Sequence, residues 1–298
     1  MHGVIRRASL FNTGRIDHLY KDPHDKDARM WLHFGDMSDS MSLAGIVGMV
    51  QPDEVYNLAS MSQVRASFDI PIYTGDITGV GQTRMLEALR NVKPDTKIYF
   101  AGSSEMFGAS PPPQNEDTVF RPQSPYGAAK LYGYWITKTY RTGYNMFASN
   151  GILFNHESPR RGDTFVTKKI VRAAVRIKLG KEKTVFLGNL ETLRDWGYAG
   201  DYVVAMYLIL QAAKPDDWVV ATGEKHTIRE FAERSFQSLG LDFYSYCDYD
   251  DRYARPNDVY ELCGDSSKIR TQLGWKPKVN FEQLIDMMVK SVYDEEAK

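Results

Sequence analysis

The chain has only two cysteines among its 298 residues, Cys247 and Cys263. One pair of cysteines cannot form the disulfide framework of a small secreted protein, so a reducing, cytoplasmic location is expected. The six histidines are scattered without the spacing of metal ligands, and no metal site is expected. No apolar run reaches the length of a membrane span, and the opening residues MHGVIRRASLF do not follow a signal-peptide pattern.

An excess of either charge is also missing, because 37 lysines and arginines oppose 38 acidic residues and leave a net charge of −1. This balance points to neither nucleic acid nor a membrane surface as a partner. Hydrophobic residues make up 43% of the chain and charged residues 25%, which is ordinary for a globular protein. The length suits one large α/β unit or two fused units.

The first two thirds of the chain alternates apolar or β-branched runs with helical stretches. This alternation predicts parallel strands joined by right-handed crossovers, which is the doubly wound α/β layout of nucleotide-binding proteins. A polar loop is expected after the first of these strands. The predicted strands are 53–60, 97–104 and 146–155, and the predicted helices are 79–92 and 126–145.

Catalytic residues of a doubly wound sheet lie at the carboxyl ends of its strands. Three of the predicted strands end near Ser60, Ser103 and Asn155, so these positions are the first candidates for a site.

The residues after 156 are more polar and more helical. A capping box of Thr227 and Glu230 predicts a helix over 226–240, and Asn280 is predicted to cap a last helix. We therefore expect a nucleotide-binding domain formed by 1–155 plus about 193–222, and a smaller α-rich substrate lobe formed by about 156–192 plus 223–298.

The stretch SPYGAAK places a tyrosine and a lysine on one face of a helix. Ser124 suits the cap and Pro125 the first turn, so Tyr126 and Lys130 form an i,i+4 pair. An ammonium near a phenol should lower the pKa of the tyrosine and produce a base for a sugar hydroxyl. A solvated surface pair is the alternative, and the preceding strand, which ends in GSSE, argues against it.

These features together resemble the extended short-chain dehydrogenase/reductase superfamily and, within it, the GDP-mannose 4,6-dehydratase family. The resemblance spans nearly the whole chain, and its most specific motifs are NHESPRRG and RDWG. The matching stretches are 6–20, 56–60, 103–108, 124–135, 150–162, 165–170, 187–203, 221–224, 255–259 and 273–277.

The resemblance implies dehydration of GDP-mannose to GDP-4-dehydro-6-deoxy-D-mannose through bound NADP. Tyr126 would deprotonate the 4-hydroxyl, and Lys130 would bind the nicotinamide ribose. Ser103 stands where relatives usually have threonine and would bond the C4 oxygen. Glu105 would remove the C5 proton once C4 is a ketone. The pair of Ser104, on the substrate side, with Glu105 favours this family over dTDP-glucose dehydratases and epimerases.

Alternatives accompany these assignments. Glu105 could be a solvated loop acid. The protein could also be a reductase or epimerase acting on another nucleotide sugar, or a catalytically inactive scaffold.

The predicted cofactor is NADP, because Arg6 and Arg7 follow a strand where an NAD enzyme usually has an acid. A solvated strand edge is the alternative for these arginines, and a structural role is the alternative for His156. The remaining cofactor residues implied by the resemblance are Ala8, Ser9, Asp36, Met37, Leu58, Ala59, Ser60, Ser62, Tyr73, His156 and Arg161.

The guanosine diphosphate of the substrate needs cations and hydrogen-bond donors. The resemblance implies Asn155, Lys169, Arg194 and Arg255 for this role. Arg194 could instead form a structural ion pair with Asp195 or Asp201.

The glycine-rich GxxGxxG turn of the family is missing from these 298 residues. In relatives this turn precedes the stretch that begins here at His2, and the glycines of 75–82 do not replace it. We expect a mis-called start, a fragment or a natural truncation, with weak NADP binding as the consequence. The aromatic and basic loop 10–20 should contact a neighbouring subunit, which predicts a homodimer or homotetramer.

Overall fold

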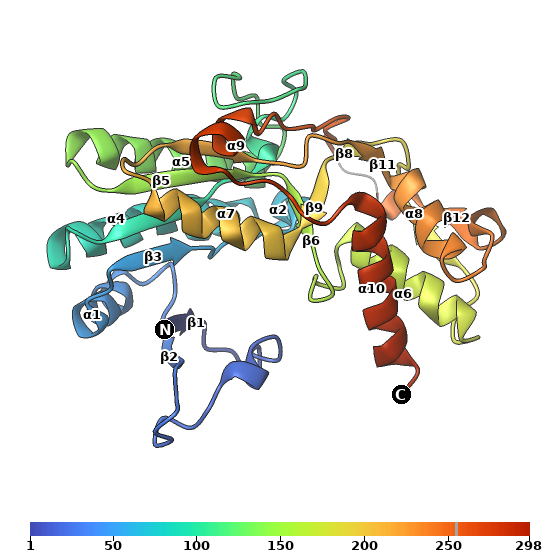
Figure 1. The fold of residues 1–298 in the computed structure, drawn as a ribbon, viewed down its shortest axis with the longest axis horizontal. Coiled ribbons are helices and arrows are strands. Elements are labelled where there is room, and N and C mark those ends of the chain that lie inside the picture. The colour runs from blue at the N-terminus through green and yellow to red at the C-terminus, as the bar shows by residue number, and fades with distance from the viewer. Residues whose placement is uncertain (254–255) are drawn as a thin grey trace.

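The computed structural model describes residues 1–253 and 256–298, and it has the predicted α/β fold (Figure 1). Its main sheet is parallel throughout, and the strand order is β10-β5-β4-β3. The strands are β3 (Glu54–Asn57), β4 (Lys97–Ala101), β5 (Ala148–Leu153) and β10 (Asp217–Val220).

Helices cover both faces of this sheet, because successive side chains of a strand point to opposite sides. In β4, Ile98 belongs to the core under α1 and α4, whereas Tyr99 and Ala101 belong to the core under α7. The covering helices are α1 (Ser40–Val50), α4 (Gly81–Val92), α5 (Pro125–Gly143), α7 (Ala199–Gln211) and α9 (Ser267–Leu273).

The start of α5 confirms the predicted cap. The Ser124 hydroxyl accepts a hydrogen bond from the Gly127 amide at 3.0 Å, and Pro125 opens the first turn. These two residues fix where the face that carries Tyr126 and Lys130 begins.

The segment predicted as a polar loop after β3 is helical, which corrects that prediction. Its polar side chains bond to the backbone of their own helices: the Ser67 hydroxyl donates to the Val64 carbonyl, and the Thr74 hydroxyl donates to the Ile70 carbonyl. The composition therefore resembled that of a loop. The elements are α2 (Val64–Asp69), α3 (Pro71–Thr74) and a π-helical stretch η2 (Gly75–Val80) that continues into α4.

The N-terminal strands β1 (His2–Ile5) and β2 (Trp31–Phe34) form a separate parallel pair, joined through a loop with the short helix η1 (Asp17–Leu19). Figure 1 shows this pair beside α1, away from the four-stranded sheet. Val4 and Ile46 of α1 both lie close to Gly35, which ties the pair to that helix.

The second lobe packs α6 (Val166–Lys178), α8 (Ile228–Gln237) and α10 (Phe281–Glu296) around one apolar cluster. The capping box of Thr227 with Glu230 and the Asn280 cap are both confirmed. The remaining elements are β6 (Asn155–Glu157) paired with β9 (Trp196–Tyr198), β7 (Val185–Leu187) paired with β12 (Cys247–Tyr249), β8 (Leu193–Arg194) paired with β11 (His226–Thr227), and the short helices η3 (Ser104–Met106), η4 (Phe243–Ser245) and η5 (Asp251–Tyr253).

Among the described helices, none combines the length and the apolar character needed to cross a bilayer.

Candidate functional site

A cavity of about 980 Å³ lies where the strands of the main sheet end and the second lobe begins. The three positions singled out from the strand ends, Ser60, Ser103 and Asn155, all line it. The structure brings the following sequence-predicted residues to its wall: Leu58, Ser60, Ser62, Ser103, Ser104, Glu105, Tyr126, Lys130, Asn155, His156, Arg161, Lys169 and Arg194.

Tyr126 and Lys130 are both buried on the inner face of α5. The Lys130 ammonium donates to the Ala101 carbonyl at the end of β4, at 2.7 Å, and lies 5.1 Å from the centre of the Phe100 ring. The end of β4 therefore fixes the lysine, and the lysine side chain joins α5 to the sheet.

The pKa values in this pair correct the sequence prediction. Burial raises the pKa of Tyr126 to about 12; the Ser103 hydroxyl acts in the opposite direction, the Glu105 charge raises the pKa further, and Arg161 lowers it. Burial also lowers the pKa of Lys130 to about 7. Desolvation disfavours both charged forms, so the expected lowering of the Tyr126 pKa by Lys130 is not what this structure shows.

The carboxylate of Glu105 lies next to the tyrosine because of two local features. The Ser103 hydroxyl caps η3 by accepting from the Glu105 amide at 3.2 Å. Gly127 lets α5 approach η3 closely, since a Cβ at this position would stand 2.6 Å from the Glu105 carbonyl oxygen. Glu105 is buried rather than solvated, which disagrees with the alternative of a solvated loop acid.

His156 is held as a neutral ring. Its Nδ1 lies 2.8 Å from the Phe154 carbonyl, and the ring stacks on Tyr202 with centroids 4.9 Å apart. Because a carbonyl only accepts, Nδ1 carries the proton and Nε2 is an acceptor. Burial lowers the pKa of His156 to about 4, so the ring stays neutral at physiological pH.

The far side of the cavity is formed by the second lobe. Lys169 donates to the Phe186 carbonyl at 2.5 Å and lies over the Tyr253 ring. Arg194 Nη2 lies 3.6 Å from Asp258 Oδ1.

The alternative of an ion pair between Arg194 and Asp195 or Asp201 is not what the structure shows. The Asp195 carboxylate accepts from the amides of Thr222 and Gly223, and the Asp201 carboxylate accepts from two amides that precede α10. Arg255, also predicted here, lies outside the described residues.

The other predicted cofactor residues lie outside the cavity lining, and all except Ala59 form a second group near the ends of β1 and β2. Arg6 donates to the Tyr73 hydroxyl at 2.5 Å. The pKa of the Asp36 carboxyl is lowered, chiefly by the Ser38 amide, with Arg6 contributing. Met37 is buried in the core, and Arg7 lies over the Phe34 ring. Ala8 and Ser9 are exposed. The Ala59 amide donates a hydrogen bond to the Asn57 side chain.

These two groups suit the two ends of a phosphorylated nicotinamide dinucleotide. Hydroxyl and amine groups for a ribose line the cavity, and a guanidinium stands at the end of β1, where a 2′-phosphate needs one. No group of three or more metal-ligating side chains occurs in the part of the chain that the structure describes.

Sequence reasoning missed several lining residues. Glu157 and Thr167 are buried polar residues of the cavity wall. Asn189, in the loop after β7, and Tyr253, at the end of η5, reach the wall from farther along the chain. Glu157, Thr167 and Asn189 lie inside stretches that match the family, but nothing in those stretches indicated what the three side chains contact.

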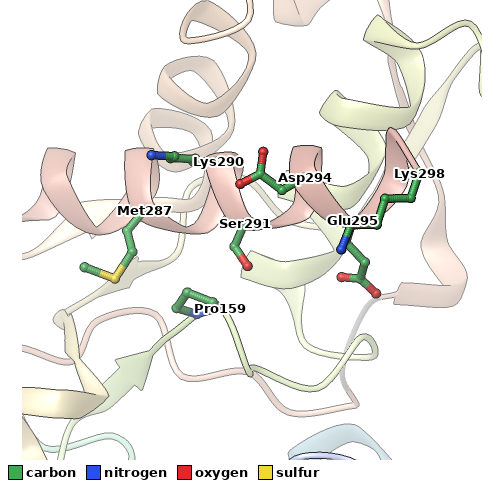
Figure 2. Close-up of a pocket in the computed structure, with 7 residues that line it drawn as sticks. All are labelled: Pro159, Met287, Lys290, Ser291, Asp294, Glu295 and Lys298. Atoms are coloured by element: carbon green, nitrogen blue, oxygen red, sulfur yellow. The ribbon is translucent and has the colours of Figure 1, made fainter.

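A second hollow, of about 570 Å³, lies on the outer face of α10 near Pro159 (Figure 2). Its charged lining residues include both signs, among them Lys290 and Asp294. None of the candidate residues lines this hollow.

The sequence resembles curated proteins over nearly its full length. It is 55% identical over 294 residues to GDP-mannose 4,6 dehydratase 1 of Arabidopsis thaliana, a match that covers 97% of this chain and 81% of the relative. It is 47% identical over 310 residues to the human GDP-mannose 4,6 dehydratase, covering 97% of this chain and 83% of the relative. The Vibrio cholerae enzyme of the same name is 45% identical over 321 residues, covering 98% and 86%.

Solved structures share the fold. RMD from Pseudomonas aeruginosa, complexed with NADPH, matches with a TM-score of 0.80 at 21% identity, covering 89% of each chain. The dTDP-glucose 4,6-dehydratase of Bacillus anthracis, in complex with NAD, matches with a TM-score of 0.83 at 18% identity, covering 99% of this chain and 88% of that one. At these identities the likeness concerns the fold alone. The sequence model described as GDP-mannose 4,6 dehydratase matches residues 1–288, and together with the relatives above it shows that this chain belongs to the GDP-mannose 4,6-dehydratase family.

Proposed function

We propose that this protein dehydrates GDP-mannose to GDP-4-dehydro-6-deoxy-D-mannose with NADP as a cofactor that is not consumed. The observation that carries the proposal is one cavity that holds a buried tyrosine–lysine pair, a serine hydroxyl and a separate buried carboxylate. The first three groups serve oxidation of an alcohol, and the carboxylate serves a second proton transfer. The names of the relatives supply the substrate.

In the oxidation half-reaction, Tyr126 takes the proton of the 4-hydroxyl while Ser103 bonds the same oxygen. The nicotinamide, when bound, supplies the hydride acceptor and a positive charge. The phenol is protonated at neutral pH, because burial raises the pKa of Tyr126 to about 12, so Ser103 and the nearby Arg161 must help to stabilise the phenolate. Lys130, fixed by the Ala101 carbonyl, orients the ribose.

In the elimination half-reaction, Glu105 removes the C5 proton, which the new C4 ketone has made acidic. The 6-hydroxyl then leaves as water, and the hydride lost from C4 would be returned to C6. Of the two protons taken up by Tyr126 and Glu105, one leaves with the 6-hydroxyl and the other returns to C5. Carbon 4 ends as a ketone and C6 as a methyl group, so the cofactor returns to its starting state.

The residues proposed to bind substrate and cofactor come from the cavity lining and from the group near the ends of β1 and β2. We place Asn155, Lys169, Arg194 and Ser104 on the side of the nucleotide sugar, with Arg255 as a prediction outside the described residues. We place Arg6, Asp36, Tyr73, His156 and Arg161 on the side of the cofactor, with the other residues that the family resemblance implied.

We infer further that a second copy of the chain covers the loop 10–20. Arg15 Nε donates to the Arg160 carbonyl at 2.8 Å, and His18 Nε2 lies 2.9 Å from Arg160 Nη2, so the loop rests on its own chain. Leu10 and Phe11 nevertheless stay exposed, and such apolar side chains suit a subunit contact. A monomer in light scattering at micromolar concentration would contradict this. A cytoplasmic location remains a prediction.

The reaction is tested by incubating the purified protein with GDP-mannose and a large excess of NADP, because this chain is expected to bind NADP weakly. Mass spectrometry should show the loss of one water from the sugar nucleotide without accumulation of NADPH. Stoichiometric NADPH without water loss would indicate a simple dehydrogenase. No change of substrate, together with no cofactor binding, would favour the scaffold alternative.

A further inference from the structure

Glu157 is a buried carboxylate at the cavity wall to which the proposed mechanism gives no role. It ends β6, two residues after Asn155, so the two side chains lie on the same face of that strand. Only 1% of the residue is exposed. A buried charge of this kind is costly unless it is paired and hydrogen-bonded.

Two partners meet on one oxygen of this carboxylate. Arg161 Nε lies 3.1 Å from Glu157 Oε2, an ion pair without the alignment of a hydrogen bond. The Thr167 hydroxyl, buried in the first turn of α6, donates to the same oxygen at 2.7 Å. Burial raises the pKa of Glu157, and Arg161 and Thr167 both act against that rise.

Arg161 is restrained on two sides as a result. Its guanidinium carbon lies 3.7 Å from the centre of the Phe165 ring, and its Nε faces Glu157. Neither Nη atom has a hydrogen-bond partner among the described residues. A planar guanidinium whose terminal nitrogens remain available at a cavity wall suits a phosphate oxygen.

We propose that Glu157, itself held by Thr167, is a positioning residue that fixes Arg161 so that its terminal nitrogens meet a phosphate of the dinucleotide cofactor. The inference rests on the proposed function, in which Arg161 contacts that cofactor. Glu157 touches neither cofactor nor substrate and acts only through Arg161.

The test is a double-mutant cycle with Glu157→Gln and Arg161→Met. Dissociation constants for NADP and, separately, for GDP are measured by ligand-observed NMR, which extends to weak binding. Each single variant should weaken NADP binding about tenfold, as expected for a charge-assisted contact. The double variant should bind no more weakly than Arg161→Met alone, and GDP binding should stay within about twofold of wild type in every variant.

Glu87→Gln is the matched control. Glu87 Oε1 also faces an arginine Nε, that of Arg90, and accepts from a hydroxyl, that of Tyr140, but it lies on α4 outside the cavity lining. This variant loses the same kind of contact and should leave NADP binding unchanged. Should Glu157→Gln fail to fold, Thr167→Val replaces the hydroxyl with a methyl group of similar size. This variant should weaken NADP binding by about twofold to threefold, also through Arg161.

The outcomes distinguish the cofactor contact of Arg161 from the positioning role of Glu157. If Arg161→Met does not change NADP binding, the cofactor contact in the proposed function is wrong. If Arg161→Met weakens binding and neither Glu157→Gln nor Thr167→Val does, only the positioning role is wrong. The positioning role would also be wrong if the losses of NADP affinity in the two single variants were additive in the double variant. It would be wrong as well if the variants weakened GDP binding in place of NADP binding.

Discussion

Two parts of this molecule both contain parallel strands and reach opposite degrees of burial. The wall formed by β4, α5 and β5 holds Tyr126 and Lys130 with 8% and 3% of each residue exposed. The pair β1–β2 leaves Val4, Trp31 and Phe34 exposed. A parallel strand is stable when both of its faces are covered, and two strands alone are marginal. The core therefore preorganises Tyr126 and Lys130, whereas Arg6 depends on a strand pair that contributes little burial.

The largest effects are expected inside the buried wall. Glu105→Gln should still permit oxidation at C4 but block elimination, and Tyr126→Phe should suppress both steps because oxidation comes first. Losses of about 10²–10⁴ in turnover are typical when a general base is removed. Water loss is followed by mass spectrometry, and transient NADPH by absorbance.

If Glu105→Gln turned over at nearly the wild-type rate, Glu105 would have no place in the mechanism. Substitution of the exposed Lys178 on α6 is a suitable control, because this residue lies outside the cavity and should not affect either step.

The next largest effect should come from adding backbone donors for the cofactor beside the exposed part. The 298 residues contain no GxxGxxG turn, and backbone donors of such a turn hold the cofactor pyrophosphate. Fusing the strand, turn and helix of a relative ahead of Met1 should strengthen NADP binding by at least about two orders of magnitude, since charge-assisted bonds contribute roughly 1.5–3 kcal/mol each.

Titration calorimetry on the chain with and without the fused segment measures this gain. Micromolar or tighter binding by the 298-residue chain itself would show that the turn is dispensable, and it would remove the functional difference between the two regions.

A smaller effect should reveal the cost of burying Lys130. Its pKa is about 7 in the folded protein against an ordinary value of 10.5, so between these pH values the unfolded chain binds more protons. Stability should therefore rise as pH increases from 7 to 10.5. The total rise should be a few kcal/mol, because a tenfold difference in proton affinity corresponds to ~1.4 kcal/mol.

Lys130→Met should raise the melting temperature at and below pH 7 and reduce the rise in stability at higher pH. Lys178→Met, at an exposed position, should leave the pH dependence unchanged. Denaturant unfolding across this pH range measures both variants. An unchanged slope in Lys130→Met would mean that the ammonium is not desolvated as the structure indicates.

The smallest effects are expected from a valine-to-alanine substitution made once in each of the two regions. Val220→Ala in β10, where the residue is fully buried, should cost about 2 kcal/mol of the free energy of unfolding. Val4→Ala in β1, where 46% of the residue is exposed, should cost less than about 0.5 kcal/mol. Equal costs, measured by urea unfolding, would show that the β1–β2 pair is packed as tightly as the main sheet.

The sequence predicted structural features correctly where their physical cause lies within a few residues of the chain. The caps at Ser124, Thr227 and Asn280 were predicted and confirmed, because a capping side chain bonds to an amide only two or three residues away. The alternation of strands and helices gave the parallel sheet, and the strand ends indicated which residues would line the cavity. The same reasoning failed for residues 64–78, which are mostly helical, because polar side chains such as those of Ser67 and Thr74 bond to helical carbonyls instead of to water.

The sequence by itself determined the fold class, the family and the residue types of the site, since these depend on periodicity and on motifs contiguous in the chain. Only the tertiary structure decided how those residues are tuned. Whether Lys130 lowers the pKa of Tyr126 depends on how deeply β4 and α5 bury both groups, and that desolvation reverses the expected direction. The contact of Glu157 with Thr167 likewise joins a strand end to the first turn of the next helix, because folding, and not spacing along the chain, brings their side chains together.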